Sequence, residues 1–252
     1  VGSTTALVNL LTNFFLGMSV SVNVLTARFA GAGNNRQIHR IIHTAISLSM
    51  ISGFILTLIG IIFAPDFLRL MKTPDDVLEL SALYLRLYFT GMIPMMIYNF
   101  GSSVLRSKGD TKRPLIYLTI AGIVNVILNL IFVIIFKMDV KGVGLATSVS
   151  QFISAFLIIR CLMNEKDAFK FSFKNLILDF NLISSILKIG IPAGIQGVIF
   201  ALSNVVIQSS VNSFGNIVMA GSAAASSIEG FVWVSMNAFS QGALTFMSQN
   251  IG

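Results

Sequence analysis

Residues 114–136 read PLIYLTIAGIVNVILNLIFVIIF, a run that contains no charged side chain. A helix needs about 20 predominantly apolar residues to cross the hydrocarbon layer of a membrane. The run is long enough for one crossing, and charged residues lie on both sides of it, Arg113 before and Lys137 after. We therefore expect a transmembrane helix in this part of the chain.

Other stretches of the 252-residue chain have the same character. They lack Asp, Glu, Lys and Arg over residues 1–27, 44–65, 87–105, 142–159, 189–228 and 230–252. The stretch 189–228 is too long for one crossing, and Gly215 and Asn216 divide it into a helix near 189–213 and another near 220–247 that absorbs the last stretch. The sequence thus predicts an all-α, polytopic transmembrane helix bundle with seven spans.

The composition supports a membrane protein and argues against other classes. Hydrophobic residues make up 55% of the chain and charged residues 11%, whereas a soluble domain carries about 25% charged residues. So few charges could not cover the surface of a soluble enzyme of this size. The net charge of +7 does not indicate a nucleic-acid partner, because Lys and Arg are divided among short loops instead of gathering on one face.

The distribution of the basic residues predicts the orientation. Loops 28–43, 105–113 and 160–188 hold 12 of the 17 Lys and Arg residues, and loops 65–79 and 137–141 hold four. Lys and Arg concentrate on the cytoplasmic side of membrane proteins. We expect a multi-pass protein of the plasma (inner) membrane, with the three basic loops in the cytoplasm and residue 1 outside.

The two ends of the chain resemble each other. Residues 1–33 align with residues 220–252 at a shift of 219, with identity at seven of 33 positions. Two helices that cross in the same direction indicate a parallel repeat, as in transporters built from two halves. We expect a fragment of a two-lobe protein with six helices in each lobe. Residues 1–163 would form the first lobe without its first helix, 164–188 a cytoplasmic linker, and 189–252 the first two helices of the second lobe.

Short motifs follow one another along the chain. They are ARFAGAGNNRQIHRIIHTA (27–45), LRSKGDTKRP (105–114), NVILNLIFV (125–133), GVGLATSVSQ (142–151), GIPAGIQG (190–197) and SQNIG (248–252). In this order and spacing the sequence resembles the multidrug and toxic compound extrusion (MATE) family, over what would be its second to eighth helices. The resemblance implies a secondary active antiporter that exports small organic, often cationic, compounds against Na⁺ or H⁺ by alternating access.

The same resemblance sets expectations for partners. We expect a monomer in the lipid bilayer that is not an enzyme, binds no cofactor and carries Na⁺ or H⁺ as its coupling ion. ATP is not expected, because the Gly-Asp turn of residues 105–114 lacks the Walker pattern and follows a helix. One departure concerns the fifth helix of the family, where many members carry Asp and this chain has Asn129.

Glu229 is the only acidic residue inside an expected span. A carboxylate at the middle of a membrane is costly unless it faces protein or water, so such residues are functional by default. Trp233, one turn further on, offers a ring face to an organic cation. Asn237 falls on the same helical face. The alternative is a Glu229 that lies nearer the outer rim or is neutral and bonded to a neighbouring helix.

Amide side chains give further candidates for an ion-coupling or substrate cavity. They are spaced along one face of three expected helices: Asn9 and Asn13, Asn125 and Asn129, and Asn204 and Gln208. Such amides can line a wet cavity or form hydrogen bonds between helices, each contributing about 1 kcal/mol. Asn125 and Asn129 are slightly favoured as coupling residues, because the family that the sequence resembles has its coupling position here.

Two other features have structural alternatives. Pro94 lies within the third expected span, where it removes a backbone hydrogen bond and favours a bend. His39 and His43 are four residues apart in a basic loop, but without a neighbouring Cys or carboxylate they make a poor metal site.

Two other functions remain as alternatives. A flippase for lipid-linked oligosaccharides or lipids would favour interior Arg and Lys residues that hold a pyrophosphate, and only Arg86 lies within a span, near its end. An intramembrane enzyme would need clustered Asp, His or Ser–His groups, which Glu229 alone does not supply.

Overall fold

The fold is known from a computed structural model, which describes the backbone of residues 2–70, 75–212 and 216–251. The description excludes the side chains of residues 2–11, 70, 75–77, 205, 208–209, 211–212, 216–220, 223–224 and 226–227. Within these ranges the chain is helical and has no strand, which confirms the all-α fold. The helices are α1 (Gly2–Gly31), α2 (Asn35–Leu70), α3 (Asp75–Phe89), α4 (Met92–Ser107), α5 (Lys112–Leu130), α6 (Asp139–Met163), α7 (Phe180–Asn212) and α8 (Asn216–Ile251).

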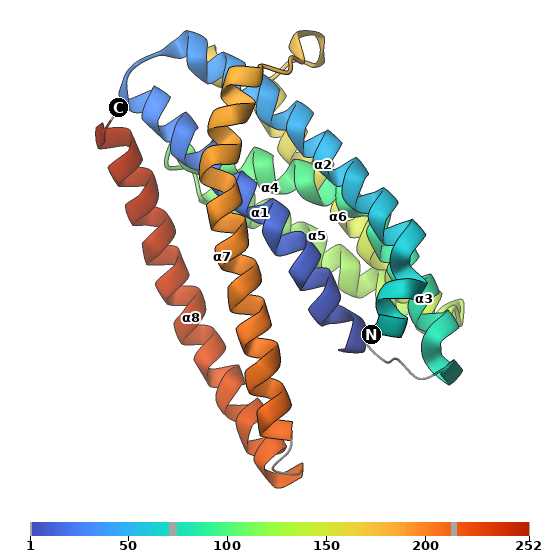
Figure 1. Ribbon diagram of the computed structural model, residues 1–252. Coiled ribbons are helices and arrows are strands. Elements are labelled where there is room, and N and C mark those ends of the chain that lie inside the picture. The colour runs from blue at the N-terminus through green and yellow to red at the C-terminus, as the bar shows by residue number, and fades with distance from the viewer. Residues whose placement is uncertain (1, 71–74, 213–215, 252) are drawn as a thin grey trace.

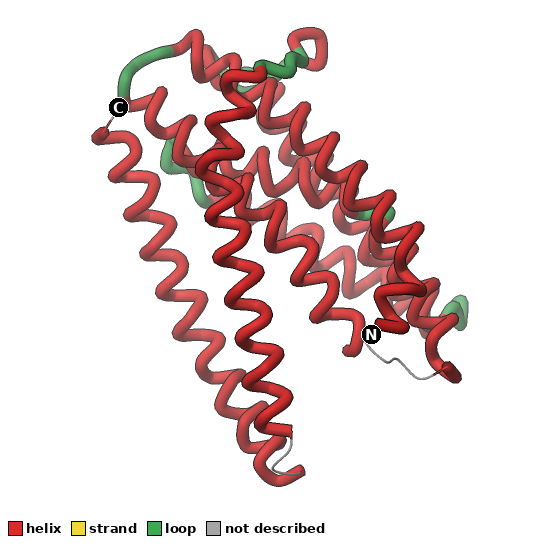
Figure 2. The backbone as a smooth tube through the Cα atoms, in the orientation of Figure 1, coloured by secondary structure: helices red, strands yellow, loops and turns green. Residues whose placement is uncertain are grey.

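Shorter turns complete the description. A π-helix, η1 (Ile131–Ile135), continues α5, and two 3-10 turns, η2 (Asp167–Phe169) and η3 (Phe173–Asn175), lie between α6 and α7. Figure 1 shows the long helices side by side, with α1 and α8 running in the same direction and their C-terminal ends close together. In Figure 2 the connections near residues 31–35, 107–112 and 164–179 lie toward one end of the bundle, so the three basic loops share that end.

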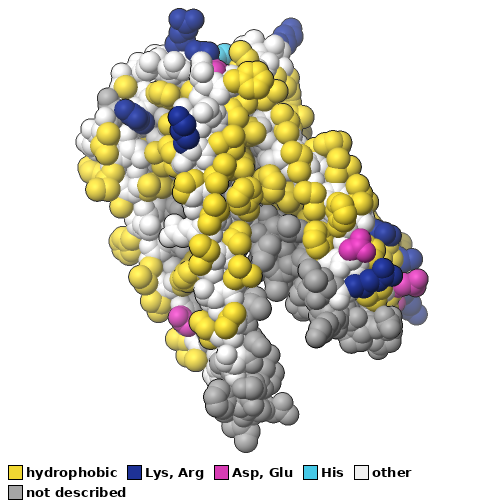
Figure 3. Space-filling view, viewed as in Figure 1, with side chains coloured by type: hydrophobic (Ala, Val, Ile, Leu, Met, Phe, Trp, Pro, Cys, Tyr) yellow, Lys and Arg dark blue, Asp and Glu magenta, His cyan; other side chains and the backbone are white. Residues whose placement is uncertain are grey.

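Five described helices are long and apolar enough to cross a membrane: α1, α2, α5 with η1, α6 and α7. The bent pair α3–α4 would make a sixth. Apolar side chains cover the outer surface of the long helices in Figure 3, whereas Lys and Arg lie near the ends. On α5, for example, Ile123 and Val126 are more than half exposed, as expected for side chains that face lipid.

The third expected span is not one straight helix. α3 and α4 meet at Thr90 and Gly91 with a bend of 43°. Pro94 explains the place of the bend, because its ring clashes with the carbonyl four residues earlier, that of Thr90, and it has no N–H to donate there. Ser148 of α6 holds the broken end, donating to the Leu87 carbonyl at 2.6 Å. The bend therefore lies one turn before Pro94.

The boundaries of the last two helices also differ from the charge pattern. α7 begins at Phe180, nine residues before the charge-free stretch, so the second part of the expected linker 164–188 is helical. Asp179 explains this start, since its Oδ1 accepts hydrogen bonds from the backbone N–H of Asn181 (3.1 Å) and Leu182 (3.4 Å). The helix break was expected at Gly215 and Asn216, and Gly215 lies outside the described residues. Asn216 is already helical, since α7 is described to Asn212 and α8 from Asn216.

Glycines bring α1 and α7 into backbone contact. A Cβ atom on Gly17 would lie 2.3 Å from the backbone nitrogen of Gly194, and one on Gly194 would lie 2.5 Å from the Phe14 carbonyl oxygen. Small residues allow membrane helices to approach closely and gain dispersion energy. The motif GIPAGIQG, which contains Gly194, therefore packs α7 along α1.

Candidate functional site

The described spans contain a group of four polar residues between α5 and α6, which we call the amide cluster. It consists of Asn125 and Asn129 of α5 and Thr147 and Ser150 of α6. The Asn129 Nδ2 donates to Asn125 Oδ1 at 3.0 Å, and the Asn125 Nδ2 lies 3.5 Å from Thr147 Oγ1 and 3.4 Å from Ser150 Oγ. The two asparagines predicted as a pair are thus in direct contact, and they face hydroxyl groups of the neighbouring helix.

The hydrogen bonds in the cluster have a defined direction. Thr147 donates its hydroxyl proton to the Val143 carbonyl at 2.9 Å, and Ser150 donates to the Thr147 carbonyl at 2.7 Å. Both hydroxyl oxygens are therefore available as acceptors for Asn125. The chain of donors begins at Asn129, whose own Oδ1 is buried and has no hydrogen-bond partner in the described structure.

An unpartnered buried acceptor is unusual, because it costs about 1–3 kcal/mol. Asn129 Oδ1 could lower this cost by accepting a hydrogen bond from a donor or by binding a cation, since amide and hydroxyl oxygens suit hard cations. The four side chains of the cluster are uncharged. The cluster can therefore offer oxygen atoms to a metal cation but has no group that would hold a proton at neutral pH.

Two motifs supply these residues. Asn125 and Asn129 belong to NVILNLIFV, and Thr147 and Ser150 belong to GVGLATSVSQ. The π-helix η1 begins two residues after Asn129, and π-helical turns inside helices are frequent at functional sites. Sequence reasoning missed Thr147 and Ser150, although their motif was recognised, because the register between two helices is not visible in a single sequence.

The acidic candidate lies elsewhere, on α8. The side chains of Glu229 and Trp233 are exposed, and Asn237 is half-buried on the same helix. α8 packs against α1, and less closely against α7 and α4. The structure therefore places the Glu229 face and the amide cluster on different helix pairs, so it does not bring the two groups of candidates together.

The remaining amide candidates occupy α1 and α7. Asn13 is half-buried at the contact between these helices, where its Cβ lies 3.5 Å from the position a Cβ on Gly197 would take. Asn204 is exposed on α7. The side chains of Asn9 and Gln208 lie outside the described residues.

The C-terminal end of α8 contacts the first helices at the basic end of the bundle, through contacts that sequence reasoning did not identify. We call them the closing contact. Thr245 Oγ1 lies 3.2 Å from Asn23 Oδ1, and Gln249 Nε2 donates to the Ser107 carbonyl at 2.6 Å. A Cβ atom on Gly31 would lie 1.8 Å from the Gln249 carbonyl oxygen, so the backbones of α1 and α8 meet here. The last motif of the chain, SQNIG, contains Gln249 and is the sequence feature that pointed to this region.

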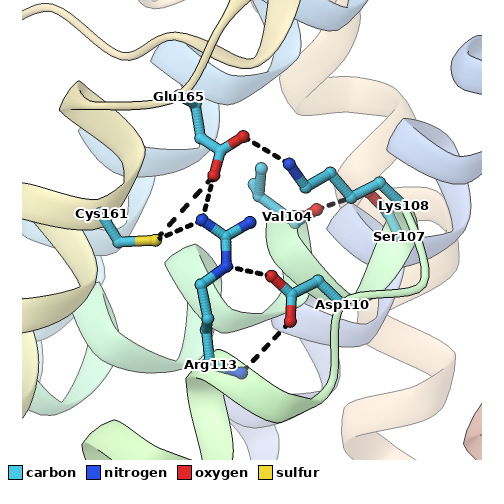
Figure 4. Close-up of polar contacts among 7 residues, drawn as sticks. All are labelled: Val104, Ser107, Lys108, Asp110, Arg113, Cys161 and Glu165. Atoms are coloured by element: carbon cyan, nitrogen blue, oxygen red, sulfur yellow. Dashed lines mark hydrogen bonds and ion pairs between the residues drawn. The ribbon is translucent and has the colours of Figure 1, made fainter.

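The loop between α4 and α5 is held by charged side chains at the same end (Figure 4). Glu165, after α6, pairs with both Lys108 and Arg113, and Arg113 also pairs with Asp110. Burial by itself would raise the pKa of Glu165, but the hydrogen bonds from Lys108 and Arg113 outweigh burial and lower it below its ordinary value. These cations of the motif LRSKGDTKRP are therefore engaged within the protein.

Comparison with known proteins relates the chain to a protein family. The family model named MatE matches residues 1–131, about half of the chain. The "Probable multidrug resistance protein YoeA" of Bacillus subtilis is 28% identical over 250 residues, covering 96% of this chain and 54% of the relative. The "Probable multidrug resistance protein YpnP" of the same organism is 33% identical over 193 residues, covering 77% of this chain and 43% of the relative.

A solved structure shows the same fold. A variant of the Vibrio cholerae MATE transporter VcmN superposes with a TM-score of 0.86 at 18% identity, over 98% of this chain and 56% of that one. The chain spans about half the length of the relatives it matches. The match to the family model and the transmembrane helices together show that this chain belongs to the MATE family of membrane transport proteins.

Proposed function

We propose that the chain forms part of a two-lobe secondary active transporter that exports small organic compounds across the plasma membrane in exchange for Na⁺. The names of the relatives support multidrug export. The observation that carries the proposal is the amide cluster between two transmembrane helices, in which Asn129 Oδ1 is buried and no described residue donates a hydrogen bond to it. Its oxygens are the ion-coupling site, and the three basic loops face the cytoplasm.

The chemistry of the cluster selects the ion. Asn125, Asn129, Thr147 and Ser150 do not titrate near pH 7, so no proton can be taken up or released there. Na⁺ needs only oxygen ligands, which these side chains provide. The resemblance to the MATE family implies Asp at the position of Asn129 in many members, and a carboxylate can bind either Na⁺ or a proton. The change to Asn129 therefore restricts this lobe to a metal cation.

A second site would take the organic substrate. The carboxylate of Glu229 and the ring of Trp233 lie one helical turn apart on the exposed face of α8, a combination that attracts organic cations. Asn237 and Asn204 extend polar surface along α8 and α7, and Asn13 does so along α1. Asn9 and Gln208, whose side chains lie outside the described residues, are included from their sequence spacing alone. These residues are the proposed lining of the substrate cavity.

The closing contact supplies the conformational part of the mechanism. It joins the C-terminal end of α8 to α1 and α4, while the opposite ends of α1 and α8 diverge in Figure 1. In an alternating-access cycle, separation of Thr245 from Asn23 would open the cytoplasmic side. Ion binding at the amide cluster would bias this equilibrium, since a ligand shifts a population only through its different affinity for the two states.

Transport in liposomes tests the proposal. The full-length protein is reconstituted, and export of a fluorescent organic cation is driven by a Na⁺ gradient or by a proton gradient. We expect Na⁺ to drive export and Asn129→Leu to lower the Na⁺-driven rate at least tenfold. Asn250→Leu is the matched control, because Asn250 is exposed near the end of α8 and bonds only to its own helix. Export driven by protons alone, or an unchanged rate in Asn129→Leu, would contradict the proposal.

A further inference from the structure

The connection between α6 and α7, residues 164–179, runs across the basic end of α2. Phe171 in this connection is fully buried, and its backbone N–H donates to the Leu162 carbonyl of α6 at 3.0 Å. The ring of Phe171 stacks on the ring of His43, with the centroids 5.2 Å apart and the planes 28° apart. His43 is itself fully buried. The α6–α7 connection is therefore anchored on α2 through one histidine.

The hydrogen bonds of His43 define its protonation state. Nδ1 lies 2.7 Å from the His39 carbonyl oxygen, and because a carbonyl only accepts, Nδ1 must carry a hydrogen. Nε2 receives the backbone N–H of Ser172 at 3.1 Å, so Nε2 must carry none. This arrangement exists only for the neutral Nδ1–H tautomer. A proton on Nε2 would place two donors against each other.

A second contact joins the same two segments. Arg40, one turn before His43 on α2, forms an ion pair with Asp179 at the end of the connection. Asp179 is buried and also accepts the first backbone N–H groups of α7. Asp179 therefore links the N-terminus of α7 to α2, close to the place where His43 holds the connection.

The charge pattern puts His43 at the end of the expected cytoplasmic loop 28–43, at the edge of the hydrocarbon layer. α2 has 36 residues, whereas about 20 suffice to cross, and its charge-free stretch begins only at residue 44. The preceding turns carry Arg36 and Arg40, which belong in water or among headgroups. His43 therefore stands where the pH of the aqueous compartment can reach it once the connection moves.

We propose that His43 is a proton-operated clasp, which holds the α6–α7 connection on α2 while its ring is neutral and releases the connection when Nε2 is protonated. The acceptor at Nε2 is lost on protonation, and the cation would have to remain buried against Phe171. The ion pair between Arg40 and Asp179 tethers the connection while the clasp opens.

The groups around His43 set the direction of the response. On α2 the neighbour is His39, whose ring centroid lies 4.2 Å from that of His43, and the connection contributes the uncharged Phe171 ring and Ser172 backbone. Burial and the nearby His39 lower the pKa of His43 below its ordinary value of 6.5, against the opposing effect of the backbone hydrogen bonds. The docked state thus binds fewer protons than the released state. The contribution of His43 to docking is therefore present above about pH 6.5 and is lost as the pH falls below that value.

Hydrogen–deuterium exchange tests the clasp in the full-length protein in lipid nanodiscs. The measured quantity is the exchange rate of the peptide around Ser172, divided by the intrinsic rate at each pH. We expect protection to fall severalfold between pH 7.5 and 5.5, up to the limit of about tenfold for one group with a released-state pKa of 6.5. His43→Gln keeps a donor and an acceptor but cannot titrate, so its protection should not depend on pH. His39→Gln is the matched control and should keep the pH dependence.

Two results would overturn the proposal: equal wild-type protection at both pH values, or the wild-type pH dependence in His43→Gln. The wild-type profile decides alone if His43→Gln does not fold. Any effect of the clasp on transport rests on the proposed function, because only movement of α7 and α8 relative to the first helices would strain the connection. The exchange measurement needs no transport, so failure of the clasp and failure of the transport proposal are distinguishable.

Discussion

Asn129 lies at the centre of the proposed coupling site. Its Nδ2 donates to Asn125, and its Oδ1 is buried with no hydrogen-bond partner among the residues that the structure describes. The spacing of four residues was enough to predict that the two amides share one face of a helix. The contribution of Thr147 and Ser150 could not be predicted from the sequence. Hydroxyl residues are common in membrane helices, where they usually donate a hydrogen bond to a carbonyl of their own helix, as these two do.

Thr147→Val removes an oxygen from the amide cluster while keeping the volume of the side chain. Loss of one acceptor corresponds to about 1 kcal/mol, so the apparent Na⁺ affinity for transport should fall about fivefold. The measurement is the dependence of export on Na⁺ concentration in liposomes. Thr119→Val is the control, because Thr119 is on the exposed side of α5 and bonds only to the Leu115 carbonyl. Equal Na⁺ affinities of the two variants would count against Thr147 as a ligand.

Glu229→Gln removes the charge of the acidic candidate and keeps its shape. If Glu229 attracts organic cations, export of a cationic dye should fall at least tenfold, while export of a neutral dye changes little. Glu79→Gln provides a matched change at an exposed position on α3. Unchanged export of the cation, with unchanged ion dependence, would show that Glu229 has no role in transport.

At the scale of helices, the charge-free stretches predicted where the spans lie but not how far each helix extends. Charged residues continue a helix beyond the membrane, as in α2, which begins at Asn35 although its charge-free stretch begins at residue 44. Pro94 indicated a bend, and its position one turn earlier follows from the clash with the preceding carbonyl. The start of α7 depends on the cap and ion pair of Asp179, a long-range contact with Arg40 that no local pattern contains.

Gly194→Ala tests the packing of α7 on α1. The added methyl group would lie 2.5 Å from the Phe14 carbonyl oxygen, and overpacking of this kind costs about 1–3 kcal/mol. We expect a lower Tm in detergent. Gly230→Ala is the control on α8, where nothing lies within 4 Å, and it should leave the Tm unchanged or raise it, since Ala favours helix more than Gly. A Gly194→Ala protein as stable as the control would contradict the close contact.

At the scale of the whole molecule, the repeat between residues 1–33 and 220–252 predicted two helices of the same direction, and α1 and α8 have it in Figure 1. Their contact through Thr245 and Asn23 was not predictable, because a repeat relates two segments without placing them together. The division into lobes at 164–188 stays a prediction. The closing contact joins the two expected lobes through α8 and α1, so cross-linking it tests whether the lobes must separate during transport.

A disulfide across the closing contact should stop transport. Asn23→Cys and Thr245→Cys are combined in a protein with Cys161→Ser, so that no other thiol of this chain competes. Oxidation should lower export at least tenfold, and a reductant should restore it. Asn23→Cys with Ser235→Cys, ten residues away on α8, serves as the control pair. Full transport by a protein shown to be cross-linked would mean that α1 and α8 need not separate.

The exchange of Na⁺ for an organic compound can be measured most directly in the reverse direction. In an antiporter a gradient of either solute drives the other, so a substrate gradient alone should move radioactive Na⁺ against its own gradient in liposomes that contain the full-length protein. We predict substrate-driven Na⁺ accumulation in the wild type and its loss in Asn129→Leu. The absence of such accumulation in the wild type, or its persistence in Asn129→Leu, would contradict coupling at the amide cluster.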